Sequence, residues 1–400
     1  MNLRETLAVV GTLLLGLLIG MAFLVVVAPR LLVPTPQIPR TPTPPGEAGA
    51  LDGAVSPTTA ATPPLEHCPP DQVRAAHAAL PPYVPTQGRF VVAAGDRFAA
   101  GGVDFVVRGV NYYPVNTPWR RFLTETSPET AAQEFRLMRA AGLNTLRLFV
   151  WHQPLFQCPG DGAVPRAEAF ARLDQIIRLA AEAGFRLIVT LNDLPDLDHY
   201  PLYAVHPHTQ MQTAYIVARY RDEPAIMAWD LRNEGDIDYR ERFDKAQVIA
   251  WLEKTSQQVR ALDPNHLITA GWLLDANATA PYVDFLSFHH WRSAGELQDR
   301  ITALQAVTDK PLVLEEVGYS TLNRSPEEQA ALLDQALAVA ERNRLAGWLV
   351  WTAFDFPRDA TCVPPFCPSP DNQEHYFGLW RVDYTPKPAV EVIRRYTGSP

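Results

Sequence analysis

The sequence lacks an excess of basic residues. Lys and Arg total 35 against 44 Asp and Glu, which gives a formal net charge of −9. Because nucleic-acid binding depends on basic side chains that neutralise phosphates, we exclude nucleic acid as a partner. Only 20% of the 400 residues are charged and 47% are hydrophobic, a composition that excludes disorder throughout the chain. The length allows one large domain with appendages, and we expect a monomer.

Cysteine is also scarce. The four cysteines form no CxxC pair, and no histidine lies at a spacing that would complete a zinc site. In an exported protein Cys362 would pair with Cys367 and Cys68 with Cys158, whereas four unpaired buried thiols are the alternative. The polar loop 193–199, with histidines soon after it, fits no known metal-binding spacing, so we expect no metal.

Charge is absent altogether from Leu7 to Ala28. As a helix this run would span roughly 33 Å, enough for a hydrocarbon core of ~30 Å. After a short N-terminal tail, residues 1–6, we therefore predict a transmembrane signal-anchor at residues 7–28. A cleaved signal peptide is the alternative, but such peptides have shorter apolar stretches and a small-residue exit that Val27-Ala28-Pro29-Arg30 does not provide.

Residues 29–85 are rich in Pro, Thr and Ala, as in Pro39-Arg40-Thr41-Pro42-Thr43-Pro44-Pro45. Such a composition buries no apolar core and prefers extended geometry. We predict a linker that is either a semi-rigid stalk or a tail that only provides reach. The rest of the chain, residues 86–397, is then one domain outside the cytoplasm, held to the membrane or secreted if the first segment is cleaved.

From residue 86 onward, short apolar runs alternate with amphipathic stretches. The runs lack polar alternation, which is typical of strands buried on both faces. Ser127 before Pro128, and Ser325 before Pro326, are N-cap signals for two of the helices. The expected strands are 104–112, 143–150, 185–192, 226–233, 266–272, 283–289, 311–316 and 346–354, and the expected helices are 127–142, 168–184, 240–262, 294–308 and 325–345.

This alternation predicts an α/β fold, a (β/α)8 TIM barrel. An open doubly wound sheet is the competitor, but its Gly-rich phosphate turn after the first strand is missing, because the chain there reads Asn111-Tyr112-Tyr113-Pro114. A short N-terminal β-hairpin is expected over residues 89–107, where it would plug the N-terminal mouth of the barrel.

Polar and aromatic side chains gather at the predicted strand ends, where the chemistry of such barrels takes place. Glu234 follows the fourth strand and Glu315-Glu316 ends the seventh. Two carboxylates from different strands favour acid/base and nucleophilic work on a glycosidic bond, and aromatic rings suit the faces of sugars. The simpler alternative is that each Glu caps a helix or pairs with Arg147. Candidate substrate-binding residues are Arg147, Asn233, Asn192, His289, Trp291, Trp351, Tyr112, Trp151 and Trp272.

These residues resemble those of clan A glycoside hydrolases, and most of all family 5, the cellulase and β-mannanase family. The stretch 229–234, Trp-Asp-Leu-Arg-Asn-Glu, resembles the strand-4 Asn-Glu motif, and 314–318, Leu-Glu-Glu-Val-Gly, resembles the strand-7 nucleophile motif. The resemblance implies Glu234 as acid/base and Glu316 as nucleophile. Neighbouring strand residues point to opposite faces, so Glu315 and Glu316 are not both expected to face the substrate.

The same resemblance assigns the supporting residues. Arg147 matches the Arg that supports the nucleophile, His289 the His of a His-x-Tyr motif, and Trp351 the strand-8 Trp beneath the substrate. Asn192 falls where mannanase-like members often have Asn. Trp291 stands where the family has the Tyr that hydrogen-bonds the nucleophile, a departure that affects Glu316.

The resemblance implies hydrolysis of a β-linked glucan or mannan with retention, by double displacement and without a cofactor. Glu234 must hold a raised pKa while Glu316 stays ionised with the help of Arg147. Two alternatives stay open: a glycan-binding surface protein that has lost turnover, and a transglycosylase of envelope polysaccharides.

Overall fold

Eight parallel strands form the centre of the fold. The computed structural model describes residues 65–193, 202–203, 208–361 and 372–398. Within them the strand order is β10-β9-β8-β5-β4-β13-β12-β11, and a parallel bridge between Trp272 and Phe288 joins the two ends into a barrel. The strands are β4 (Val107–Tyr112), β5 (Thr145–Phe149), β8 (Arg186–Thr190), β9 (Ile226–Asp230), β10 (Leu267–Thr269), β11 (Leu286–His290), β12 (Leu312–Val317) and β13 (Gly347–Val350).

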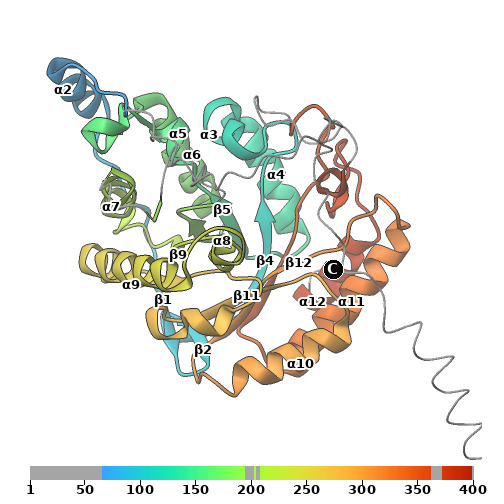
Figure 1. Ribbon diagram of the computed structural model, residues 1–400. Helices are drawn as coiled ribbons and strands as arrows, with labels where there is room; N and C mark the ends of the chain where they lie inside the picture. Colours follow the sequence, from blue (N-terminus) through green and yellow to red (C-terminus); the bar gives the residue numbers. More distant parts are fainter. Residues whose placement is uncertain (1–64, 194–201, 204–207, 362–371, 399–400) are drawn as a thin grey trace, which may run out of the picture. The chain divides into compact units, whose positions relative to one another are not determined.

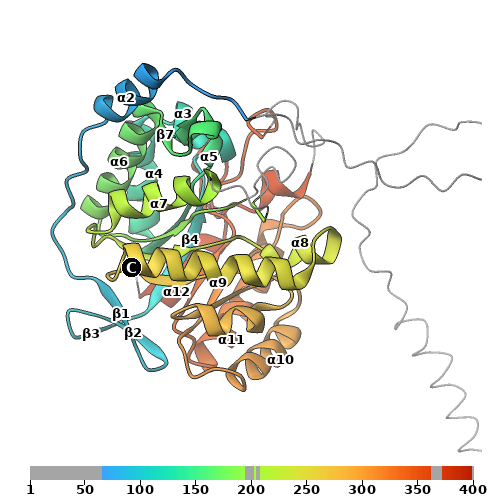
Figure 2. The same ribbon diagram turned by 60° about the vertical axis from the view of Figure 1, so that its left-hand side comes forward.

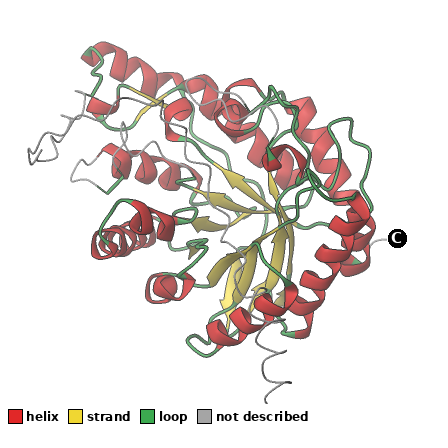
Figure 3. Ribbon diagram, turned by 45° about the vertical axis from the view of Figure 1, so that its right-hand side comes forward, coloured by secondary structure: helices red, strands yellow, loops and turns green. Residues whose placement is uncertain are grey.

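Helices surround this barrel, as Figure 3 shows. They are α3 (Phe122–Glu125), α4 (Pro128–Ala140), α5 (His152–Leu155), α6 (Ala167–Glu182), α7 (His208–Tyr220), α8 (Gly235–Glu241), α9 (Lys245–Leu262), α10 (Ala294–Gln305), α11 (Pro326–Arg342) and α12 (Ala389–Thr397). Short elements between them are η2 (Trp119–Arg121), β6 (Phe156–Gln157), η3 (Pro159–Asp161), β7 (Val164–Pro165), η4 (Ala276–Tyr282) and η5 (Gln373–Tyr376). The expected (β/α)8 barrel is confirmed. All residues of β5, β9, β11, β12 and β13 are buried, which explains their unbroken apolar runs.

Local sequence signals start the helices where expected. The Ser127 side chain accepts a hydrogen bond from the Thr130 N–H at the start of α4. Ser325 forms a capping box with Glu328 at the start of α11. Each cap satisfies backbone donors that a helix N-terminus otherwise leaves unpaired.

A small antiparallel sheet closes the N-terminal end of the barrel, as expected. It comprises β1 (Val91–Ala94), β2 (Arg97–Ala100) and β3 (Val103–Phe105). Phe98 is fully buried, with its ring edge-on to Phe285 at 5.1 Å between centroids. It packs there with Ile188 and Leu349, which come from two barrel strands. The expected strand 104–112 is therefore wrong as one element: its first residues belong to β3, and the barrel strand begins at Val107.

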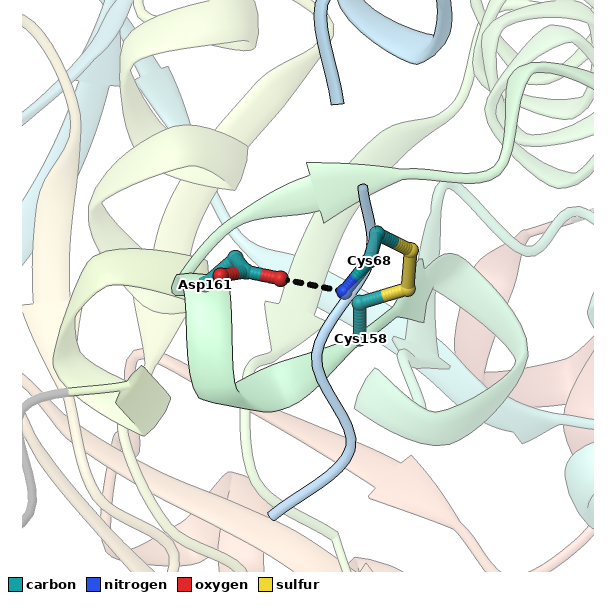
Figure 4. A group of neighbouring side chains, drawn as sticks. All are labelled: Cys68, Cys158 and Asp161. Atoms are coloured by element: carbon teal, nitrogen blue, oxygen red, sulfur yellow. Dashed lines mark hydrogen bonds between the residues drawn. A yellow bond between two sulfur atoms is a disulfide. The ribbon is translucent and has the colours of Figure 1, made fainter. Parts of the chain in front are cut away.

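The described part of the chain before this small sheet, which begins at residue 65, contains a helix, and this corrects the expected linker for these residues. Helix α2 (Pro70–Ala79) packs Ala76 against Cys158 and Val164. Cys68 is joined to Cys158 by a disulfide, and its N–H donates to Asp161 Oδ2 at 2.6 Å (Figure 4). Figures 1 and 2 place α2 and the β1–β3 sheet at opposite ends of the barrel.

Two further differences concern helices. The expected helix 240–262 is two helices, α8 and α9, because the chain turns between Glu241 and Lys245. Helices α7 and α12 were not expected from the sequence. The anchor expected at residues 7–28 and the pair Cys362–Cys367 lie outside the described residues. Among the residues that are described, no helix has both the length and the apolarity needed to cross a membrane.

Candidate active site

Glu234 lies directly after β9, at the C-terminal end of the barrel. Its backbone adopts the left-handed conformation, with φ 50° and ψ 38°, which costs a non-glycine residue about 1–3 kcal/mol. Its N–H donates to the Gly271 carbonyl at 2.7 Å, and α8 begins at the next residue. The turn therefore directs the carboxylate away from the helix, and 19% of the side chain is exposed.

Glu316, near the end of β12, lies close to Glu234. His289 of β11 contacts both acids through Nδ1, at 2.8 Å from Glu234 Oε1 and 3.4 Å from Glu316 Oε2. One oxygen of each carboxylate and one ring nitrogen all lie within 4.8 Å of one another. The structure therefore brings together the two acids that the sequence analysis paired, although 82 residues of the chain, by their numbering, separate them.

Arg147 of β5 binds Glu316, one acid of this pair. Its fully buried guanidinium donates to Glu316 Oε1 through Nη1 and to Asp230 Oδ2 through Nε and Nη2, the last at 2.6 Å. It also donates to the side-chain oxygens of Asn111 at 3.1 Å and Asn233 at 2.9 Å. Because these donors leave the guanidinium in one plane, Arg147 fixes several acceptors at once.

Glu315 also turns into the barrel, contrary to the expectation from strand alternation. The pairing register of β12 shifts beside it on both neighbouring strands, a β-bulge that lets consecutive side chains face the same side. Glu315 is fully buried, 3.7 Å from Arg147 Nε and 3.7 Å from His289 Nε2. Neither carboxylate oxygen has a hydrogen-bond partner among the described residues.

The electrostatics of the acid pair differ from the sequence-based expectation. Burial raises the pKa of Glu316 to about 7, although the charges of His289 and Arg147 oppose it. Burial also raises the pKa of Glu234, but the hydrogen bond from His289 and its charge outweigh burial and hold the pKa below its ordinary value. Burial lowers the pKa of His289, yet the charge of Glu316 and the contacts with Glu234 and Glu315 raise it to about 10. The directions of these two pKa shifts are opposite to those expected from the sequence for Glu234 and Glu316.

Asn233 is held in one orientation. Its Oδ1 accepts from Arg147 and its Nδ2 donates to Asp193 Oδ1 at 3.1 Å. Asp193 also accepts from the Tyr113 hydroxyl at 2.6 Å, and Tyr113 in turn accepts from Trp151 Nε1 at 2.8 Å. The amide is therefore assigned by its partners on both sides, with the oxygen towards Arg147.

Two of the predicted tryptophans lie beside the acids. Trp291 lies beside Glu234 and lowers the pKa of that carboxyl, and its ring packs edge-on against Phe377. Trp351 is 9% exposed, and its Nε1 donates to Glu374 at 3.3 Å. Trp291 therefore contacts the predicted acid/base rather than the nucleophile that the family Tyr would bind.

Three other predicted substrate-binding residues are buried in the structure, and their role in substrate binding stays a prediction. Tyr112 is fully buried and its hydroxyl donates to Glu134 at 2.6 Å. Trp272 is fully buried next to the barrel-closing bridge. Asn192 is 5% exposed and donates to the Leu231 carbonyl at 2.9 Å. Strand-end positions look alike in sequence, but only some of these side chains project into the mouth.

The structure adds residues that the sequence analysis did not assign. Asp230, inside the strand-4 motif, binds Arg147, and Asp193 holds Asn233. Asp230 lies four residues before Glu234 in an all-apolar strand, and a charged residue in such a strand is a signal for a buried partner. Glu315 offers the same signal within β12, whereas Tyr113 and Glu374 offer none.

Among the described residues, two groups have the donors for a metal ion. One is Glu234, His289 and Glu316, and the other is Cys68, Cys158 and Asp161, whose cysteines are joined in the disulfide. Arg147 already binds Glu316, and a positively charged guanidinium at that distance opposes a cation. The structure describes Asp193 of the polar loop 193–199 and His208 after it. Asp193 accepts hydrogen bonds from Tyr113 and Asn233.

Comparison with known proteins gives the family. The chain is 25% identical over 292 residues to the probable mannan endo-1,4-beta-mannosidase F of Neosartorya fischeri, covering 60% of this chain and 62% of the relative. It is 27% identical over 313 residues to the mannan endo-1,4-beta-mannosidase A of Podospora anserina, covering 64% and 80%. The chain spans about half, 51%, of the mannan endo-1,4-beta-mannosidase F of Aspergillus fumigatus.

Solved structures agree on the fold. An endo-1,4-beta-mannanase from Rhizomucor miehei superposes with a TM-score of 0.58 and 19% identity, covering 78% of this chain and 100% of that one. An exo-beta-1,4-mannosidase from Opitutaceae bacterium strain TAV5 gives 0.66 and 20% identity, covering 77% and 62%. The family model for cellulase, glycosyl hydrolase family 5, matches residues 103–356, more than half of the chain. The chain therefore belongs to glycosyl hydrolase family 5.

Proposed function

We propose that this protein is a retaining glycoside hydrolase that cleaves a β-linked mannan or glucan, with mannan the first candidate. The observation that carries the proposal is the meeting of Glu234 and Glu316, whose oxygens approach within 4.8 Å across His289. Retaining glycosidases need carboxyl groups about 5–5.5 Å apart, because one attacks the anomeric carbon directly, whereas inverting enzymes leave room for a water. The named relatives act on mannan, which favours mannan over glucan.

The steps follow from the positions of these groups. Glu316 attacks the anomeric carbon from one side while Glu234 gives its proton to the leaving oxygen. Glu234 then removes a proton from water, and the resulting hydroxide displaces Glu316 from the sugar. Arg147 stabilises the ionised Glu316, and His289 Nδ1, 2.8 Å from Glu234, is placed to supply the proton that Glu234 requires. Asn233, oriented by Arg147 and Asp193, is placed to bind a sugar hydroxyl.

Product analysis tests this proposal. The wild-type protein is incubated with β-1,4-mannan, mixed-linkage β-glucan and soluble cellulose, with Glu316→Gln and Glu234→Gln as matched controls. We expect shorter oligosaccharides from at least one polymer, with the β-anomer appearing first in proton NMR. For Glu316→Gln we expect kcat to fall by at least about 1,000-fold, the order of loss that follows removal of a catalytic nucleophile. An α-anomer first would overturn retention, and products longer than the substrate would favour transglycosylation.

A second candidate is a glycan-binding surface protein without turnover. Trp291 in the place of the family Tyr favours it, because the indole lacks the hydroxyl with which that Tyr hydrogen-bonds the nucleophile. Binding of a polymer by the wild type without any product would support this candidate and contradict the hydrolase.

The cellular location is a further proposal. The uncharged run 7–28 supports an anchor that holds the catalytic domain outside the cytoplasm, where polysaccharides lie. Membrane fractionation of the full chain with alkaline carbonate tests it. Full-length protein that stays in the membrane pellet supports the anchor, and release of the full-length chain contradicts it.

A further inference from the structure

Glu315 is a fully buried carboxylate of this cluster to which the proposed reaction gives no role. Its place in the barrel is specific, because a β-carbon added to Gly271 would lie only 2.0 Å from Glu315 Oε2 and 2.6 Å from His289 Nε2. The glycine therefore leaves the space that the carboxylate and the ring occupy. An isolated buried carboxylate is costly, so its charge must be matched by its surroundings.

The two nitrogens of the His289 ring have different neighbours. Nδ1 faces the proposed catalytic acids, whereas Nε2 faces Glu315 Oε2 at 3.7 Å. Neither Nε2 nor the Glu315 oxygens have a hydrogen-bond partner among the described residues, so these unpaired polar atoms face each other. At this distance the contact is an ion pair, which is strong where both side chains are fully excluded from solvent.

We propose that Glu315 is a positioning residue that keeps Nε2 of His289 protonated, so that Nδ1 is the nitrogen that exchanges a proton with Glu234. The inference rests on the proposed function and assigns a third carboxylate to the same site. It parallels the general rule that the group on one ring nitrogen of a histidine decides what the other nitrogen does.

The proton balance is simple. Before the acid step, the Nδ1–H bond of His289 breaks and an O–H bond forms on Glu234, which leaves the ring neutral with Nε2–H still facing Glu315. Glu234 then transfers that proton to the leaving oxygen. In the second half, an O–H bond of water breaks and the proton returns to Glu234, from which it can move back to Nδ1. Glu315 remains ionised throughout and gains or loses no proton.

Several charged groups share this interior with Glu315. They are Arg147 from β5, Asp230 from β9, Glu234 after β9, His289 from β11 and Glu316 from β12. Arg147 lies at the same 3.7 Å from Glu315 but also binds Asp230 and Glu316, so the charge of Glu315 is shared between the guanidinium and His289. Removing the negative charge of Glu315 should make every remaining proton in the cluster easier to lose.

The test compares Glu315→Gln, which removes the charge at similar size, with Glu315→Asp, which keeps it. The rate kcat/KM is measured against pH. Glu315 raises the pKa of Glu316 and the pKa of His289. Loss of the Glu315 charge should therefore move both limbs of the profile to lower pH by about one unit. On the alkaline limb this is a tenfold loss, whereas Glu315→Asp should keep both limbs near those of the wild type.

A merely structural role would lower kcat/KM at every pH and leave the limbs in place, and this result would overturn the proposal. Nitrogen NMR of the His289 ring gives a readout without turnover, which separates this proposal from the proposed function. If the wild type hydrolyses no glycan, a lower His289 pKa in Glu315→Gln still supports the proton placement, and an unchanged pKa overturns it. Thermal unfolding of both variants identifies any that do not fold, and the NMR titration of Glu315→Asp then decides.

Discussion

At the scale of single residues, the site is a buried set of charges in which each group determines the state of its neighbours. Arg147 bridges Asp230 and Glu316, and His289 bridges Glu234 and Glu316. With two basic and several acidic groups excluded from water, the cluster must retain protons near neutral pH, because unpaired buried charges are costly. Burial is the main cause of the raised pKa of Glu316, about 7, and the charges of Glu234 and Glu315 add to it.

Arg147→Lys tests how far the planar guanidinium matters. Lysine keeps the charge, but its three donors lie on one nitrogen. Arg147 reaches Asp230, Glu316 and Asn233 from separate nitrogens of one plane, and a single ammonium group cannot reach these three acceptors together. We expect kcat/KM to fall by about 100-fold, on the order expected for a misplaced catalytic group. Kinetics on a soluble substrate check it, with circular dichroism as a control for folding. Retention of more than half of the wild-type rate would contradict the role of Arg147.

At the scale of elements, the strand ends show what sequence reasoning could reach. The eight strands were predictable because they are mostly apolar and lack polar alternation, and Glu234 and Glu316 because both lie in recognisable motifs. Helix α7 was missed because its buried face begins with polar residues, His208, Thr209, Gln212 and Thr213, which hide the helical period. The orientation of Glu315 was missed because a bulge, which no residue pattern announced, breaks the alternation of β12.

Gly271→Ala tests the packing at the end of β10. The added methyl group would meet Glu315 and His289 well inside contact distance, so one of the two must move. Overpacking of this kind costs about 1–3 kcal/mol, and we expect the free energy of unfolding to fall by that amount along with a loss of activity. Denaturant unfolding measures it.

Gly295→Ala is the matched control, because the nearest atom to its added β-carbon is Ser293 Oγ at 4.0 Å. Its stability should stay within about 1 kcal/mol of the wild type. Equal stability of Gly271→Ala and Gly295→Ala would mean that the space beside Gly271 is not filled as described.

At the scale of the whole molecule, one barrel is closed at one end by the β1–β3 sheet and carries the acid pair at the other. The N-terminal segment is fastened along its side, through the Cys68–Cys158 disulfide and through Glu223, which accepts from Tyr83 and from the Thr86 hydroxyl and N–H. Composition placed this segment in a linker, because Pro and Ala are frequent there; the disulfide and Glu223 supply the long-range contacts that composition does not reveal.

Removal of this disulfide by Cys68→Ser with Cys158→Ser should destabilise the fold without changing the chemistry. The bond closes a loop with a sequence separation of 90, and such cross-links typically contribute about 2–4 kcal/mol. We expect a lower unfolding midpoint and an unchanged kcat, since neither cysteine touches the acids. A midpoint equal to that of the wild type in oxidising buffer would contradict the bond's contribution.

Trapping of the covalent intermediate tests the acid pair most directly. The protein is incubated with a 2-deoxy-2-fluoro-mannosyl fluoride, which slows release of the sugar from the nucleophile, and the labelled peptide is located by mass spectrometry. We predict one added sugar, attached to Glu316, and none in Glu316→Gln. A sugar attached to Glu315 or to another residue, or an unlabelled protein that still hydrolyses glycan, would contradict the assignment of Glu316 as the nucleophile.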